Sequence, residues 1–300
     1  MKDYKLNFNK YFKAFNIFSI ALIIISVALL MFKGLNFGVD FKGGTLIELR
    51  ATDKQITISQ LRQSFLNMNL GDVTVKEFGK NNDFLIKFEK KENNNSDLIG
   101  QVKEDLTKFV GPGFNFRRVE SVGPKVSTEL LKSGVIAIGL SLAAMLIYIW
   151  IRFEWQFSIG AILALLHDVL LTLGVFSLFS FEINLSIVAA VLTIVGYSMN
   201  DTVVIFDRIR ENLKKFSDIN IFDLTNISIN ETLSRTIITS TTTLLALVSI
   251  YIFGGQILKG FSLAMILGVI FGTYSSIYIA SPILILLNVS QKTILKEDKD

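Results

Sequence analysis

The chain has 300 residues, of which 51% are hydrophobic and 19% are charged, and its formal net charge is +4. Soluble globular chains are about 45–50% apolar even with glycine counted, so this composition argues against a soluble protein. The absence of cysteine excludes disulfides and thiolate metal sites, and the single histidine, His167, cannot form a multi-histidine metal centre alone. The sequence contains no Gly-x-x-x-x-Gly-Lys-Ser/Thr loop. We therefore expect no metal, no cofactor, no ATP hydrolysis and no enzyme activity.

The chain begins with a polar, basic segment, residues 1–13, which we expect to be a cytoplasmic N-terminus. An apolar run at residues 14–32 follows and is long enough to be transmembrane helix 1. A signal peptide would have a shorter apolar core and a small-residue cleavage site. We therefore expect this helix to be an uncleaved anchor.

Residues 33–131 have mixed charge, short apolar runs and many turn residues, and we expect an extracytoplasmic α/β domain there. Alternation of apolar and polar residues predicts strands, and three- to four-residue spacing predicts helices. The resulting order, βαββαβ, resembles a ferredoxin-like domain. The expected strands are 44–51, 72–78, 84–89 and 115–122, and the expected helices are 58–68 and 96–110, the second capped by Ser96.

Five more apolar segments follow, so the predicted fold is an α-helical membrane protein of six transmembrane helices with the ferredoxin-like α/β domain between helices 1 and 2. Helices 2–6 occupy residues 132–287, and residues 288–300 form the C-terminus. The five segments are about 134–151, 156–180, 184–206, 236–253 and 260–287.

Basic residues in the short loops predict the orientation of the helices. The termini, Arg152 and the loop 207–235 carry most of the lysines and arginines, whereas the opposite loops, 181–183 and 254–259, carry only Lys259. The positive-inside rule therefore predicts that both termini are cytoplasmic and that the domain at 33–131 lies outside. This placement also explains the net positive charge without a nucleic-acid partner.

The predicted cytoplasmic loop 207–235 contains apolar residues at helical spacing, including Phe206, Ile209 and Leu213. Two interpretations stay open: an amphipathic helix lying along the inner membrane surface, and a plain solvated connector.

Asp201 lies in the fourth predicted span with apolar residues on both sides. A charge at the bilayer centre costs at least about 2.5–3.5 kcal/mol, so such a residue is by default a functional candidate. The alternative is that Asp201 only pairs with a neighbouring helix. Arg235 opens the fifth span from the same side of the membrane, and its long side chain could reach inward toward Asp201 or outward to lipid headgroups.

The third span carries His167 and Asp168 near its middle. Adjacent helical residues point about 100° apart, so we expect these two not to face each other, and each to find its own partner on another helix. Two further sets of small polar residues lie in the last spans. Thr236, Thr239, Ser240, Thr241, Thr242 and Thr243 favour either interhelical packing or a water-lined path, and Gly268, Gly272, Ser275 and Ser276 predict close helix packing.

Ionisable and hydroxyl groups inside membrane helices are the materials of a proton or sodium relay. Each charge that crosses a potential of about 100 mV releases about 2.3 kcal/mol. An ion gradient could therefore replace ATP as the source of work.

Several stretches closely resemble the SecF family, which supplies the smaller subunit of the bacterial SecD–SecF protein-export complex within the resistance-nodulation-division superfamily. The two most specific are 196–212, which reads Gly-Tyr-Ser-Met-Asn-Asp-Thr-Val-Val-Ile-Phe-Asp-Arg-Ile-Arg-Glu-Asn, and 272–282. The others are 38–48, 119–126, 167–174 and 235–243.

The resemblance implies a multi-pass protein of the bacterial inner membrane that pairs with SecD, associates with the SecYEG channel and uses ion-motive force to promote release of an exported unfolded polypeptide at the outer face. It implies that Asp201 and Arg235 take part in ion translocation. Residues of a possible ion path, or positions that support it, are Asp168, His167, Asn200, Thr202, Asp207 and Thr239. Two other functions stay open: a passive scaffold that stabilises SecD or the channel, and export of a small molecule or lipid.

Overall fold

The computed structural model describes residues 6–52, 56–68, 70, 72–77, 82–88, 98–111, 113–216, 219–291 and 293–294. It divides into two compact units, one of Met1–Asn36 with Val135–Asp300 and one of Phe37–Gly134. The first is a bundle of long helices and the second contains the sheet, so each is described by itself.

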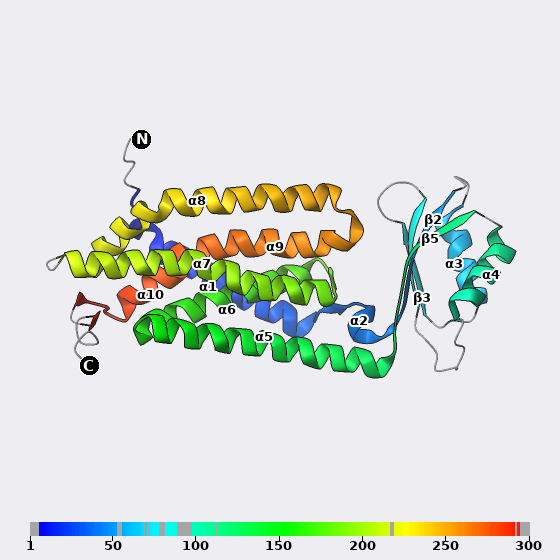
Figure 1. Cartoon of the computed structure of the whole chain (residues 1–300), viewed down its shortest axis with the longest axis horizontal. Coiled ribbons are helices and arrows are strands. Elements are labelled where there is room, and N and C mark those ends of the chain that lie inside the picture. Colours follow the sequence, from blue (N-terminus) through cyan, green and yellow to red (C-terminus); the bar gives the residue numbers. More distant parts are fainter. Residues whose placement is uncertain are drawn as a thin grey trace. The chain divides into compact units, whose positions relative to one another are not determined.

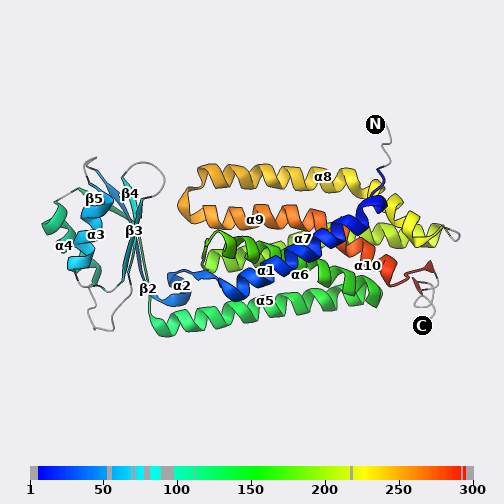
Figure 2. The same cartoon turned by 180° about the vertical axis from the view of Figure 1, so that it is seen from behind.

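Six helices in the described part of the chain are long and apolar enough to cross a membrane, as the sequence predicts. In both views of the cartoon they run alongside one another, and the start of α1 lies at the same end of the bundle as α10 (Figures 1 and 2). The helices are α1 (Phe12–Phe32, after the 3₁₀ turn Asn9–Tyr11), α5 (Pro124–Arg152), α6 (Trp155–Leu178), α7 (Leu185–Lys215), α8 (Ile221–Phe253) and α9 (Gly255–Ser275), which continues through a π-helical turn (Ser276–Ala280) into α10 (Ser281–Leu286).

The bundle has an inner and an outer set of helices. Helices α6, α7 and α9 supply most of its buried side chains, whereas α1, α5 and α8 expose long apolar faces. At one end the rings of Phe153, Phe157 and Phe206 pack edge to face or stacked at centroid distances of 5.1–6.2 Å. The inner helices therefore form the core of the unit, and any buried polar group on them must find a partner within the protein.

The closest helix contact joins α7 and α9 and uses the small residues that the sequence singles out. A Cβ at Gly272 would lie 2.9 Å from the Cβ of Ser198, and one at Gly268 would collide with the side chain of Ile194. One turn further along, Ser276 and Thr202 share a hydroxyl–hydroxyl hydrogen bond of 2.8 Å. The prediction of close helix packing is therefore confirmed, with small residues at every fourth position of α9.

The segment between the fourth and fifth spans differs from both sequence-based interpretations. Helix α7 continues to Lys215 and α8 begins at Ile221, so most of 207–235 is helical rather than a plain connector. Phe206, Ile209 and Leu213 are buried in the core of the bundle. The apolar face of this helix therefore packs on protein instead of lying on a membrane surface.

The second unit is a four-stranded antiparallel sheet with two helices. The strands are β2 (Gly44–Ala51), β3 (Val73–Glu77), β4 (Asp83–Phe88) and β5 (Phe114–Val122), and the helices are α3 (Ile58–Asn67) and α4 (Leu98–Val110). The strand order β3-β4-β2-β5 and the helices between the strands give the βαββαβ arrangement, so the ferredoxin-like prediction is confirmed. The expected Ser96 cap lies outside the described residues.

The core of this unit follows from the alternation in its central strand. Ile47 and Leu49 of β2 are fully buried, together with Leu61 and Phe65 of α3 and Leu106 of α4. Helix α3 starts with a capping box in which Thr57 and Gln60 satisfy each other's backbone amides. Three short elements were not predicted: α2 (Val39–Lys42), β1 (Asn36–Phe37) and β6 (Glu182–Ile183), of which β1 and β6 form a two-stranded sheet.

Candidate functional site

Asp201 lies on the buried side of α7, the helix that packs against both α8 and α9. Its side chain is only 4% exposed, so it does not face lipid in the folded chain. The Ser240 hydroxyl on α8 donates a long hydrogen bond of 3.4 Å to its Oδ2, and Ser240 also shares a hydrogen bond of 2.7 Å with Thr273 on α9. The carboxylate is thus sheltered by three helices, and its hydrogen-bond partners are two hydroxyls, those of Ser240 and Thr273.

Arg235 lies close enough to Asp201 to act on its charge, yet among the described residues the two side chains form no ion pair within 4 Å. The guanidinium acts on Asp201 through space. Arg235 is exposed on α8. The interaction between Arg235 and Asp201 is therefore electrostatic and not a direct ion pair.

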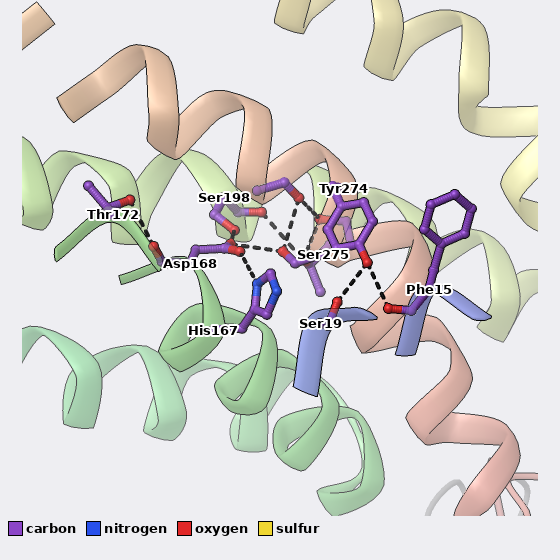
Figure 3. A network of polar contacts seen from close by, with 11 residues as sticks. Phe15, Ser19, His167, Asp168, Thr172, Ser198, Tyr274 and Ser275 are labelled. Atoms are coloured by element: carbon purple, nitrogen blue, oxygen red, sulfur yellow. Dashed lines mark hydrogen bonds and ion pairs between the residues drawn. The ribbon is translucent and has the colours of Figure 1, made fainter. Parts of the chain in front are cut away.

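Asp168 has a different environment, although it is also a carboxylate on an inner helix. Its side chain is fully buried and its Oδ2 accepts hydrogen bonds from Ser198 of α7, at 2.6 Å, and from Ser275 of α9, at 2.8 Å (Figure 3). The Thr172 hydroxyl donates to its backbone carbonyl. Asp168 therefore ties α6, α7 and α9 together.

His167 corrects one sequence-based prediction. Its Nδ1 lies 2.9 Å from Oδ1 of Asp168, so the two adjacent residues do contact each other (Figure 3). Their Cα–Cβ bonds diverge as expected, but both side chains bend toward the same space beside α9. The imidazole also stacks on Tyr274 of α9, with ring centroids 5.8 Å apart, and Tyr274 bonds in turn to Ser19 and to the Phe15 carbonyl of α1.

The other candidate residues are spread over the bundle. Asn200 is exposed on α7, and Thr202 is buried against Ser276. Asp207 pairs with Arg152 at 3.0 Å, and both side chains of this pair are nearly half exposed. Thr239 donates only to backbone carbonyls of its own helix, as Thr242 does. The structure therefore does not bring Asn200, Asp207 or Thr239 into contact with either buried aspartate.

Sequence reasoning missed Ser198 and Thr273, which bond to the two carboxylates, and Tyr274, which stacks on His167. It identified Ser275 only as a packing residue and Ser240 only as one member of a hydroxyl-rich run. Ser198 lies three residues before Asp201, and Ser275 lies two residues after Thr273, so consecutive turns of α7 and α9 serve both carboxylates. The four-residue spacing of small residues on α9 was the available signal. In the described residues, no three His, Cys, Asp or Glu side chains gather as a metal site requires.

The two carboxylates can do different things chemically. Asp168 accepts two hydroxyl hydrogen bonds besides its contact with His167, so changing its partners would require several bonds to break together. Asp201 has two hydroxyl partners, Ser240 at 3.4 Å and Thr273, and an arginine near enough to attract it, so a small shift of α8 or α9 changes its surroundings. A carboxylate in this second setting is suited to gaining and losing a cation.

Comparison with known proteins places these residues in a protein-export class of integral membrane proteins. The family model for the protein export membrane protein SecD/SecF, C-terminal, matches residues 101–290, and the model for the SecD/SecF GG motif matches residues 28–54. The protein translocase subunit SecF of Cereibacter sphaeroides is 44% identical over 94% of this chain and 89% of its own length. The corresponding subunit of Rickettsia bellii is 46% identical over 89% of this chain and 88% of its own length.

Solved structures agree with this assignment. The crystal structure of SecDF, a translocon-associated membrane protein from Thermus thermophilus, superposes with a TM-score of 0.83 and 34% identity and covers 94% of this chain. A crystal structure of SecDF in a super-membrane-facing form gives a TM-score of 0.66 and 31% identity over 98% of the chain. This chain spans only 38% and 40% of those two chains. The chain therefore belongs to the SecF family of protein translocase subunits, which are transporter components of the bacterial inner membrane.

Proposed function

We propose that this chain works with a separate SecD subunit as a proton-driven auxiliary of the Sec translocase. The proton-motive force acts on Asp201, and the pair promotes translocation and release of exported polypeptides at the outer face of the membrane. The single observation that carries the proposal is a carboxylate, 4% exposed, inside a membrane-spanning helix, whose hydrogen-bond partners in the described part of the chain are the hydroxyls of Ser240, at 3.4 Å, and Thr273. A buried charge so poorly paired is costly to maintain for stability alone.

Arg235 is a further possible partner for the Asp201 carboxylate. In the coupling we propose, the charged form of Asp201 attracts Arg235, and protonation removes that attraction. The guanidinium then turns toward the membrane surface and α8 shifts against α9. The Ser240–Thr273 hydrogen bond, which joins α8 to α9 beside Asp201, is the contact through which the shift acts.

A SecD partner accounts for the outward face of α8. Arg235 is exposed on a helix that is otherwise apolar enough to span the membrane, and Thr241 and Thr242 are exposed beside it. A cation and hydroxyls facing lipid are unfavourable, whereas a protein partner or a water path between two subunits satisfies them. The similarity to solved SecDF chains, of which this chain matches about two fifths, supports SecD as that partner.

We further propose that both termini are cytoplasmic, that the sheet unit lies outside, and that the complex works at the SecYEG channel. The support for the orientation is the clustering of lysine and arginine in the terminal segments, at Arg152 and in the 207–235 segment. The start of α1 and the end of α10 lie at one end of the bundle, as this orientation requires (Figure 2).

The test is export of a secreted protein into inverted membrane vesicles, with and without a proton gradient, for Asp201→Asn. We expect this variant to assemble with its partner in normal amounts and to lose the gradient-dependent stimulation. Asp207→Asn is a matched control on the same helix, because Asp207 lies in an exposed pair with Arg152, and exposed ion pairs contribute at most about 1 kcal/mol. It should keep the stimulation.

The rival function is a passive scaffold for SecD or the channel. It predicts that Asp201→Asn impairs export only in proportion to a fall in the abundance of the complex. Full stimulation by Asp201→Asn at normal abundance would reject the proton-driven proposal.

A further inference from the structure

The His167–Asp168 pair in α6 takes no part in the coupling proposed at Asp201. His167 is only 1% exposed, and its Nδ1 is engaged by Asp168. Its other ring nitrogen, Nε2, is buried and has no hydrogen-bond partner in the described part of the chain. A buried polar atom without a partner is uncommon in folded proteins and calls for an explanation.

We propose that His167 is a proton-binding residue and that His167 and Asp168 together form a second proton site in the bundle, separate from Asp201. The proton comes from the aqueous phase and adds to Nε2, so that the neutral imidazole becomes an imidazolium. The pair then changes from a net charge of −1 to a neutral ion pair. No covalent bond other than the N–H bond is formed or broken.

The geometry provides for both protonation states. In the unprotonated state Nδ1–H donates to Asp168, whose other oxygen accepts from Ser198 and Ser275, so three donors surround the carboxylate. In the protonated state the same Nδ1–H bond becomes part of an ion pair. The face of the Tyr274 ring, with its centroid 5.8 Å from that of the imidazole, is then next to a cation, a favourable arrangement.

The surroundings of the imidazole contain few other ionisable groups. From α9 and the π-helical turn the titratable neighbours are Tyr274 and Tyr278, whose rings pack on each other. Helix α1 contributes Ser19, which bonds to Tyr274, while its basic residues Lys13 and Lys33 lie at the two ends of that helix. Helix α7 contributes Ser198 through Asp168, and Asp201 bonds to hydroxyls of α8 and α9 instead. Asp168 is therefore the counterion of His167.

The site also has a mechanical consequence. Asp168 is bonded to α7 and α9, and the imidazole stacks on Tyr274, whose hydroxyl donates to the Phe15 carbonyl of α1. A charge appearing on His167 therefore acts on contacts that join α6 to α1, α7 and α9. Asp201 acts at the other junction, between α7, α8 and α9.

His167 is the only histidine of the chain, which makes a direct test possible. The full chain is labelled with ¹⁵N-histidine, purified through a histidine-free tag, reconstituted into liposomes with its unlabelled partner, and studied by solid-state NMR between about pH 5 and 8, where histidine ordinarily titrates. We expect the Nδ1–H tautomer at the alkaline end and imidazolium signals replacing the Nε2 lone-pair signal at the acidic end. A single neutral tautomer across the whole range in the wild-type protein overturns the proposal.

Two variants identify the counterion. Tyr274→Phe keeps the stacked ring but removes the hydroxyl bonds to α1, and it should leave the imidazolium signal in place. Asp168→Asn removes the anion, and the imidazolium signal should then be lost or weakened. If the titration of His167 is unchanged in Asp168→Asn, Asp168 is not its counterion. If that variant fails to fold, the wild-type and Tyr274→Phe titrations still decide whether His167 binds a proton.

The outcome does not depend on the proposed role of Asp201. His167→Gln retains a donor toward Asp168 but cannot bind a proton, so it should assemble normally and alter the pH dependence of gradient-stimulated export. If Asp201→Asn proved harmless, the proposal of a proton-driven function would be rejected. The NMR titration would still decide separately whether His167 binds a proton.

Discussion

Two buried aspartates of the helical bundle differ in how firmly they are held. Asp168 is fully enclosed and accepts two hydroxyl bonds of 2.6 and 2.8 Å in addition to its contact with His167. Asp201, on the next helix, has a hydroxyl bond of 3.4 Å to Ser240, a second hydroxyl partner in Thr273 and an arginine that does not touch it. The difference separates a carboxylate that joins helices from one that can change partners, and burial alone does not distinguish the two.

The largest effect should come from breaking the contact that supports both aspartates. Gly272→Val would place side-chain atoms against Ser198, the residue that donates to Asp168 and lies one turn before Asp201. Overpacking of this kind costs about 1–3 kcal/mol or more. We expect a large loss of folded protein in the membrane, measured by abundance and by fluorescence of the two tryptophans, both of which lie in the bundle.

Gly139→Val provides the control for this change, because a Cβ at Gly139 meets no atom within 4 Å. It should leave abundance close to that of the wild type. Equal loss in both variants would show that valine in a spanning helix is harmful wherever it is placed.

A smaller effect should separate the two carboxylates from each other. Asp168→Asn replaces a carboxylate that has three hydrogen-bond partners by an amide, which has one acceptor oxygen instead of two. Buried donors are then left unsatisfied, which costs about 1–3 kcal/mol. Asp201→Asn weakens only the interactions with Ser240 and Thr273, so its thermal unfolding in detergent should lie close to that of the wild type. Equal destabilisation by the two substitutions would contradict the view that Asp168 joins helices while Asp201 can change partners.

A further effect concerns the sheet unit and serves as a reference outside the bundle. Burial, together with the like charges of Lys76 and Lys42, lowers the pKa of Lys87 from its ordinary value of 10.5 to about 8. The folded protein then releases this proton at lower pH than the unfolded chain does. The free energy of unfolding of the sheet unit should therefore rise as pH increases between these two values, and Lys87→Met should abolish the rise.

This prediction can be measured because the chain has no cysteine of its own. Val75→Cys places a thiol in the buried core of the sheet unit, and its labelling rate, divided by that of the denatured chain at the same pH, reports opening of that unit. Labelling that is independent of pH in this range would contradict the lowered pKa of Lys87.

The sequence predicted well what depends on local patterns. Runs of apolar residues located all six spans, and alternation located the four strands of the sheet within about one residue. It also singled out Asp201 and Asp168 as candidate residues, because ionisable residues are rare in an apolar run. The partners of Asp168 were missed since Ser198 and Ser275 are 30 and 107 residues away, and only the packing of α7 against α9 brings them together.

The prediction for His167 was wrong for a different reason. The helical angle between adjacent residues fixes the directions of the Cα–Cβ bonds but not the rotamers beyond them. The sequence predicts either a surface helix or a connector after residue 206, but not that α7 itself continues to Lys215. The apolar stripe through Ile209 and Leu213 indicated a helix, but sequence alone did not show that the stripe packs on the bundle rather than on lipid.

The proposal that Asp201 binds and releases a proton is tested most directly by proton flux through the membrane of liposomes that contain this chain and its partner. We predict flux driven by an imposed membrane potential for the wild type, its loss for Asp201→Asn, and its retention for Asp207→Asn at equal protein content. Undiminished flux through Asp201→Asn would contradict the account.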